Sequence, residues 1–194
     1  MKERILGSCI LLQACAPSLE KEWEWNNTEI VTEEPEPEDL FRTIDATSYE
    51  EWIYLDLEDN ILVEPEDPAS SSEWDLGFMR YHIKLNSGIH GSADVESYVV
   101  NGEDFASYTQ APQEGYQKDL PDDNDDGIAE YVCAEWYDYD PATHVLTPAD
   151  RFYIMKSRNE RFYKFQVQGY YSEAGTSGHL SIYWEEIEPY QDEE

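Results

Sequence analysis

Apolar and polar residues alternate with a period of two in several short stretches of this chain, and turn residues separate the stretches. Residues 52–57 alternate in this way, and a second strand is expected to begin near Ile61 after the turn at residues 58–60. Because successive side chains of a β-strand point to opposite faces, this pattern predicts a β-hairpin with one buried face.

The C-terminal part of the chain repeats the pattern. Residues 152–156 and 162–168 are rich in aromatic and β-branched residues and flank the turn at 157–160, and residues 180–184 alternate after a glycine-marked turn. No stretch of useful length has the 3.6-residue period of a helix. The sequence therefore predicts an all-β fold, with antiparallel strands in a sandwich or barrel-like domain.

Length and charge limit the possible partners. A chain of 194 residues favours one domain with a sizeable core, and 40% hydrophobic and 14% aromatic residues predict that it folds. We place this domain at residues 41–190. The formal net charge of −32 repels phosphate backbones and anionic lipid headgroups, so binding to nucleic acid or electrostatic attachment to a membrane is not expected.

The first residues resemble an export signal. Basic residues, an apolar run at 5–12 and small residues precede Cys15, in the order of a secretory signal that is too short to span a membrane. Residues 12–15, Leu-Gln-Ala-Cys, resemble a lipobox, which predicts a lipoprotein signal peptide at 1–14 and lipidation at Cys15. An ordinary cleaved signal or a buried first strand is the alternative interpretation.

Residues 15–40 are acidic and interrupted by prolines, which predicts a disordered, extended linker between the lipid and the domain. The expected location is the bacterial cell envelope, at the outer membrane or the cell surface, with the lipid as the only membrane anchor. If Cys9 leaves with the signal and Cys15 carries lipid, Cys133 remains alone and no intrachain disulfide can form.

Residues 75–85 are expected to form one strand within the distinctive segment 70–91. A period of two then places Met79 on the more apolar face and His82 on the opposite face. This interpretation predicts that Met79 and His82 do not share a site. For Met79, packing in the core is the alternative to a ligand role.

The same segment resembles the signature of the HmuY family, through Trp74-Asp75, Gly77, Phe78, Met79 and Arg80-Tyr81. The resemblance extends over about residues 45–185. Members of the family are all-β lipoproteins of the bacterial envelope, and characterised members bind haem through two side chains on the iron. The resemblance implies haem as the cofactor, Met79 on an axial ligand position, and an outer-membrane haem receptor or haemoproteins as partners. Thioether sulfur is a competent haem ligand.

Two histidines are candidates for the second axial ligand. His90 lies in the turn after the signature strand, and His144 precedes the C-terminal strands. For each of them, a surface or capping residue is the more common interpretation of a histidine in such a position. His179 and Met155 are weaker candidates.

An acidic loop resembles the first half of a calcium-binding loop. Its ligands would be Asp122, Asn124, Asp126, the carbonyl of Ile128, and Glu130. A cysteine stands where such a loop needs a bidentate glutamate, so a plain acidic turn explains the loop equally well. The alternative function is a non-catalytic surface interaction module of the same fold, with bound calcium and without haem.

Catalytic motifs are missing from the sequence. There is no Gly-x-Ser-x-Gly, no phosphate-binding loop and no His-Glu-x-x-His. We therefore expect a binding protein and not an enzyme.

Overall fold

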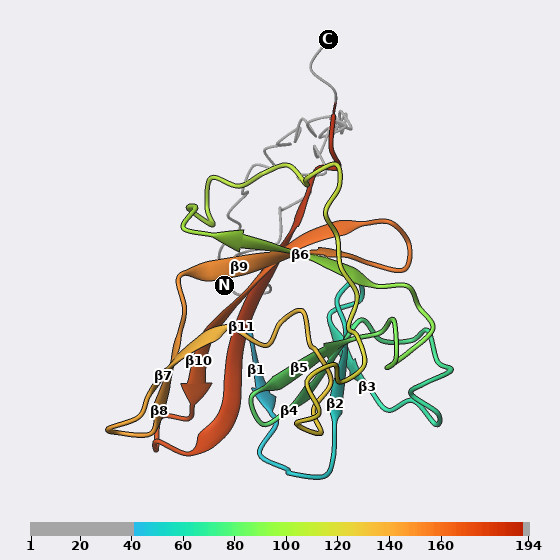
Figure 1. Cartoon of the computed structure of the whole chain (residues 1–194). Helices are drawn as coiled ribbons and strands as arrows, with labels where there is room; N and C mark the ends of the chain where they lie inside the picture. The colour runs from blue at the N-terminus through green and yellow to red at the C-terminus, as the bar shows by residue number, and fades with distance from the viewer. Residues whose placement is uncertain (1–40, 192–194) are drawn as a thin grey trace, which may run out of the picture. The chain divides into compact units, whose positions relative to one another are not determined.

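The computed structural model of the protein describes residues 41–191, and the expected signal peptide, Cys15 and linker lie outside these residues. Within this range the chain is built from β-strands and loops, and none of it is a helix that could cross a membrane (Figure 1). The strands are β1 (Phe41–Asp45), β2 (Ile53–Asp56), β3 (Ile61–Val63), β4 (Leu76–Met79), β5 (His82–Leu85), β6 (Glu96–Asn101), β7 (Tyr137–Asp140), β8 (Val145–Pro148), β9 (Arg151–Lys156), β10 (Phe162–Tyr171) and β11 (Ser177–Ile187).

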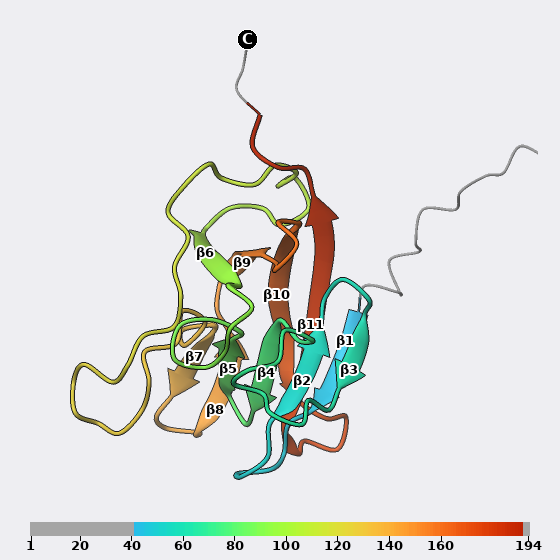
Figure 2. The ribbon, with the colours of Figure 1, turned by 90° about the vertical axis from the view of Figure 1, so that its right-hand side faces the viewer.

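The strands form three antiparallel sheets. A five-stranded sheet has the order β1-β11-β10-β9-β6, a four-stranded sheet has the order β3-β2-β4-β5, and β7 pairs with β8. Figures 1 and 2 show the four-stranded sheet beside the lower part of the long strands β10 and β11. The expected all-β antiparallel fold is confirmed.

The main core lies between the two larger sheets. Leu55 and Phe78 from the four-stranded sheet and Phe165 and Ile182 from the five-stranded sheet have no exposed surface and belong to one cluster. The ring centroids of Phe78 and Phe165 are 6.5 Å apart. Burial of these apolar side chains is the main favourable contribution to folding, and its loss at one large residue costs about 3–5 kcal/mol.

The five-stranded sheet is also covered on its other face. Phe152 and Ile154 of β9 are buried in a second cluster with Ala111, whereas Tyr153 and Met155 face the main core. The strand is therefore apolar throughout, as expected for a strand buried on both faces. The Met155 side chain is fully buried in the core, so its sulfur is not accessible to a ligand at the surface.

The hairpins expected at residues 52–63 and 152–168 are confirmed as β2–β3 and β9–β10. The single strand expected at residues 75–85 is wrong. It is a hairpin, in which β4 and β5 are joined by the two residues Arg80 and Tyr81, and Met79 pairs directly with His82. Directly opposite residues of an antiparallel pair lie on the same face. The prediction that His82 points away from Met79 is therefore also wrong.

The burial of this hairpin corrects the expected core face as well. The fully buried pairs are Leu76 with Leu85 and Phe78 with Ile83, so Met79 lies on the outer face and is only half-buried. Met79 is therefore not a residue of the main core, in contrast to the core-packing interpretation.

Tertiary contacts hold the β4–β5 turn in place. Arg80 has a φ of 55°, a conformation that is uncommon for residues other than glycine. Its backbone N–H donates to the carbonyl of Ala46 at 2.8 Å, and its guanidinium donates to the Ser177 hydroxyl at 2.7 Å and the Thr47 carbonyl at 3.0 Å. Together with the Tyr49 ring, 4.4 Å from the guanidinium carbon, these groups attach the turn to β1 and β11.

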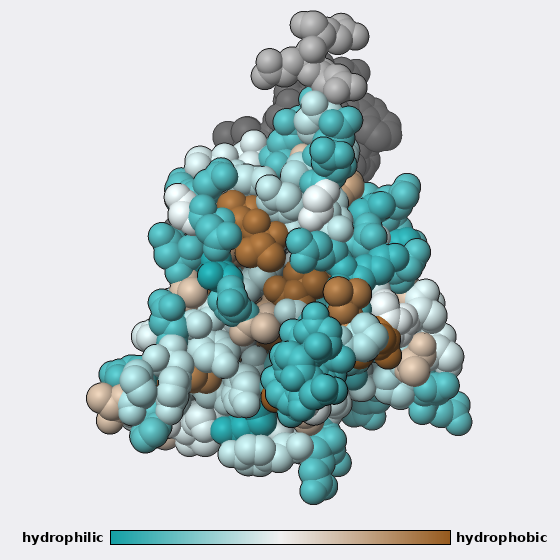
Figure 3. Space-filling model, viewed as in Figure 1, coloured by the Kyte–Doolittle hydropathy of each residue, from teal (hydrophilic) through white to brown (hydrophobic). Residues whose placement is uncertain are grey.

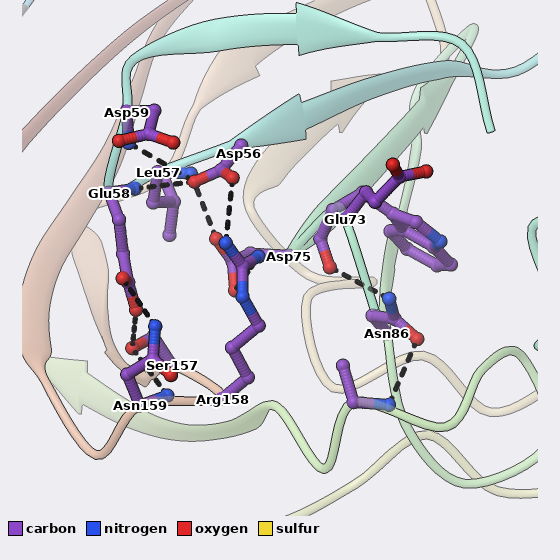
Figure 4. Close-up of polar contacts among 12 residues, drawn as sticks. Asp56, Leu57, Glu58, Asp59, Glu73, Asp75, Asn86, Ser157, Arg158 and Asn159 are labelled. Atoms are coloured by element: carbon purple, nitrogen blue, oxygen red, sulfur yellow. Dashed lines mark hydrogen bonds and ion pairs between the residues drawn. The ribbon is translucent and has the colours of Figure 1, made fainter. Parts of the chain in front are cut away.

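A second polar junction joins the β2–β3 turn to the β9–β10 turn (Figure 4). Arg158 donates to Asp56 at 2.8 Å, and Ser157 and Asn159 each donate to Glu58 at 2.6 Å. Beside them lies Asp75, which has no exposed surface. These contacts orient the four-stranded sheet against the five-stranded sheet.

Candidate functional site

A pocket of about 270 Å³ lies at the tip of the β4–β5 hairpin. We call it the hairpin-tip pocket. It is lined by Tyr81 and His82 from the hairpin and by Asp126, Ile128, Ala129, Glu130, Tyr131, Ala134 and Tyr137 from the segment that leads into β7. Aromatic and small apolar side chains thus line it together with one imidazole and two carboxylates, and a mixture of apolar surface with a few polar groups is found in ligand sites.

His82 is the imidazole of this pocket. Its ring centroid lies 4.3 Å from that of Tyr81 and 5.4 Å from that of Tyr131. Partial burial lowers its pKa below the ordinary value. The ring is therefore uncharged at neutral pH, and one of its nitrogens carries a free lone pair.

The two walls of the pocket are connected by buried polar contacts. The Asp119 carboxylate accepts hydrogen bonds from the backbone N–H of Leu85 in β5 at 2.8 Å and of Val132 at 2.9 Å. The Trp136 indole donates to the carbonyl of Tyr81 at 2.8 Å. Burial raises the pKa of Asp119 to about 6, while these N–H groups and Lys84 act in the opposite direction. These contacts connect the β4–β5 hairpin to the segment that leads into β7.

His90, a sequence candidate, lies behind the pocket wall. Its ring stacks on Tyr131 with centroids 5.2 Å apart, and Tyr131 thereby contacts both His82 and His90. Burial, followed by the nearby Lys84 charge, lowers the His90 pKa to about 4, so its contact with Asp119 at 3.8 Å involves an uncharged ring. The Nε2 atom of His90 is buried and has no hydrogen-bond partner within the described residues.

Lys84 is the cation nearest to these groups, but aromatic rings surround it. Its ammonium lies 4.0 Å from the Trp52 ring centroid and 4.9 Å from that of Tyr54. Burial lowers its pKa to about 8. Lys84 therefore stabilises the outer face of β4–β5 through cation–π contacts and does not present a free charge to the pocket.

The other sequence candidates lie outside this cluster. Met79 faces His82 across the hairpin but does not line the pocket. His144 is an exposed residue of the β7–β8 turn, and its Nδ1 is hydrogen-bonded to the Tyr139 hydroxyl. His179 lies on β11 and pairs with Asp45. The structure thus brings Met79 and His82 together and places His90 behind Tyr131, whereas it gives His144 no contact with them.

The acidic loop offers no preformed calcium site. Asp122 accepts hydrogen bonds from the backbone N–H groups of Asn124, Asp125 and Gly127. The Asn124 amide donates to Glu130 at 3.0 Å. Among residues 41–191, no group of three or more His, Cys, Asp or Glu side chains is arranged to hold a metal ion. The observed contacts are those of a self-closed acidic turn.

A larger groove of about 500 Å³ runs along β2 and β3, lined by Trp52, Tyr54, Leu62, Pro65 and their neighbours. None of its lining residues is histidine, methionine or cysteine. Figure 3 shows apolar side chains gathered near the middle of one face of the molecule, around β6, within a largely hydrophilic surface. Of these two pockets, the hairpin-tip pocket is the one that an imidazole lines.

Cys133 is a free thiol without exposed surface, packed in the main core. Burial raises its pKa well above the ordinary value. The thiol therefore stays protonated and packs in the core, where it is not expected to act as a nucleophile.

The described residues form an antiparallel all-β domain with a partly aromatic pocket at a hairpin tip. The family model described as "HmuY protein" matches residues 48–184. The chain belongs to the HmuY family. No match was found among curated proteins.

Three solved bacterial proteins have a similar fold. The apo HmuY analog of Tannerella forsythia is 20% identical with a TM-score of 0.59, covering 76% of this chain and 94% of that one. A candidate HmuY-like heme-binding protein from Bacteroides vulgatus is 20% identical with a TM-score of 0.55, at 80% and 96% coverage. A candidate lipoprotein from Bacteroides fragilis is 20% identical with a TM-score of 0.57, at 78% and 91% coverage. At this identity, the likeness shows the fold.

One residue of the candidate site differs from the sequence-based expectation. Strand alternation predicts that His82 lies on the face opposite Met79, and neither Arg80 nor Tyr81 is a glycine, proline or asparagine that would mark a turn between them. The hydrophobic pattern does contain one indication of the turn. Phe78 and Ile83 are both strongly apolar, although they are an odd number of residues apart. Two residues of opposite parity can share a buried face only if the strand is interrupted between them.

Proposed function

We propose that this protein is a haem-binding lipoprotein of the bacterial cell envelope that holds the haem iron by side chains. The observation that carries the proposal is the hairpin-tip pocket, with an uncharged imidazole between aromatic rings, in a chain of the HmuY family. The described heme-binding and lipoprotein character of the Bacteroides relatives supports it.

The residues present fit the chemistry of a haem. Histidine, methionine and tyrosine are all side chains that bind haem iron in proteins, and His82, Tyr81, Tyr131 and Tyr137 line the pocket while Met79 flanks it. Haem would supply the iron and a flat apolar ring that stacks on such side chains. We propose that one ligand comes from the β4–β5 hairpin, where Met79 and His82 are paired on one face. His90, which stacks behind Tyr131, is the remaining sequence candidate for the second ligand.

The pocket also restricts how a haem can lie. Its volume of about 270 Å³ is slightly below the range of about 300–1,000 Å³ that is usual for ligand pockets. The carboxylates of Asp126 and Glu130 line it and repel the haem propionates. The haem would therefore be bound in an open site, with the propionate edge turned to solvent.

Titration of the purified protein with ferric haem tests the proposal. A Soret band that shifts and saturates at a single equivalent is expected, and Tyr131→Ala should weaken the binding because it removes one wall of the pocket. His144→Ala is the matched control and should leave the titration unchanged. A featureless spectrum would overturn the proposal and favour the alternative, a surface interaction module of the same fold without haem.

Lipidation at Cys15 would attach the protein to the envelope, and residues 15–40 would separate the domain from the membrane. An outer-membrane haem receptor or haemoproteins would then be the recipients or donors of the haem. The function requires no catalysis.

A further inference from the structure

Met79 and His82 are related by the geometry of their hairpin. They are register partners on either side of the two-residue turn, so their side chains leave the same face of the sheet with β-carbons about 5 Å apart. This relation holds whatever the rotamers of the two side chains.

Two such side chains cannot bind one haem iron from opposite sides. The porphyrin plane would have to stand upright between two neighbouring side chains, and its ring would then run into the hairpin backbone beneath them. Met79 and His82 are therefore alternatives for the same axial position. At most one of them ligates the iron.

The pocket distinguishes between the two. His82 lines the hairpin-tip pocket and Met79 does not. The imidazole is packed between the rings of Tyr81 and Tyr131, which restrict its orientation. No hydrogen bond within the described residues occupies either of its nitrogens. Met79, by contrast, is a flexible side chain at the rim.

We propose that His82, rather than Met79, is the side chain of this hairpin that binds the haem iron. The proposal rests on the proposed haem-binding function and names the ligand of that site. It departs from the position that the family resemblance implies, because the β4–β5 turn brings a histidine to the same face, directly opposite that position.

Two variants of the full chain separate the possibilities. Met79→Leu removes the sulfur and keeps the volume, so the ferric Soret band and the affinity should stay unchanged. His82→Ala should shift the Soret band and weaken haem binding on the order of tenfold or more, because even a change behind a metal ligand costs about 10–100-fold. Added imidazole should restore the wild-type band in His82→Ala. His179→Ala is the control.

The outcomes distinguish this proposal from the proposed function. If the wild-type protein gives no saturable band, haem binding itself fails. If the wild type binds haem but Met79→Leu alters the spectrum while His82→Ala does not, the assignment to His82 is overturned. Binding that survives both changes without a spectral shift overturns it equally. Circular dichroism of His82→Ala checks the fold, and His82→Gln provides a second variant that keeps the size and polarity of the side chain.

Discussion

Asp75 is a buried carboxyl group whose ionisation opposes folding. It has no exposed surface, and one of its oxygens accepts a hydrogen bond from the backbone N–H of Leu57 at 2.8 Å (Figure 4). The other oxygen has no hydrogen-bond partner within the described residues and lies 3.9 Å from the Arg158 guanidinium. Arg158 itself donates to Asp56. Burial raises the Asp75 pKa from 3.8 to about 6, against the opposing effects of the Leu57 hydrogen bond and Arg158.

The sign of the pH effect follows from this shift. Because the folded-state pKa is raised, the folded protein binds the proton more tightly than the unfolded chain, and this group makes the protein more stable as the pH falls from above 6 toward 3.8. A shift of about two units corresponds to about 3 kcal/mol. Most of this free energy develops between about pH 7 and about pH 4.

The variant Asp75→Asn removes this titration and keeps an acceptor for the Leu57 N–H. Its free energy of unfolding, measured with urea at several pH values, should fall relative to wild type by about 2–3 kcal/mol between about pH 7.5 and about pH 4. Asp59→Asn, a change at an exposed carboxyl group of the neighbouring turn, should give a flat difference. A flat difference for Asp75→Asn would refute the assignment of the raised pKa to burial.

Two further predictions concern the hairpin tip and the charge of the protein. Gly178 has a φ of +92°, and an added β-carbon would lie 2.9 Å from the Thr47 Cα and 2.8 Å from the Arg80 guanidinium. Gly178→Ala should therefore lower the free energy of unfolding by about 1–3 kcal/mol. The loss should exceed that of Gly102→Ala, where φ is also positive but the space is open, and equal losses in urea unfolding would contradict the steric argument. Because the net charge is −32 and no free cation lines the pocket, haem affinity should increase several-fold when salt is raised from about 20 mM to about 300 mM. A loss of affinity with salt in the same Soret titration would show instead that cations hold the propionates.

Strand patterns were sufficient where the turns are marked locally. Residues 58–60 and 157–160 contain asparagine and charged residues between alternating apolar runs, and both hairpins form as expected. The contacts within the acidic loop could not be predicted from its spacing. Only the folded backbone shows that Asp122 accepts hydrogen bonds from amides of its own loop.

The candidate site depends on a turn that lacks such marks. In a continuous strand, residues three apart point to opposite faces, whereas a two-residue turn makes them direct neighbours on one face. Arg80 adopts a positive φ because Ala46, Thr47 and Ser177, which are distant in sequence, bind its backbone and side chain. Local propensity contains no information about these contacts.

The sequence by itself determined the all-β class, the acidic character, the family and the segment that contains the candidate site, because hydrophobic periodicity, composition and local motifs encode these properties directly. Only the tertiary structure decided that Met79 and His82 share a face, that His90 stacks behind Tyr131, and that Asp119 joins the two walls of the pocket. Each of these relations joins parts of the chain through a turn or a buried contact whose conformation is stabilised by packing from elsewhere in the fold.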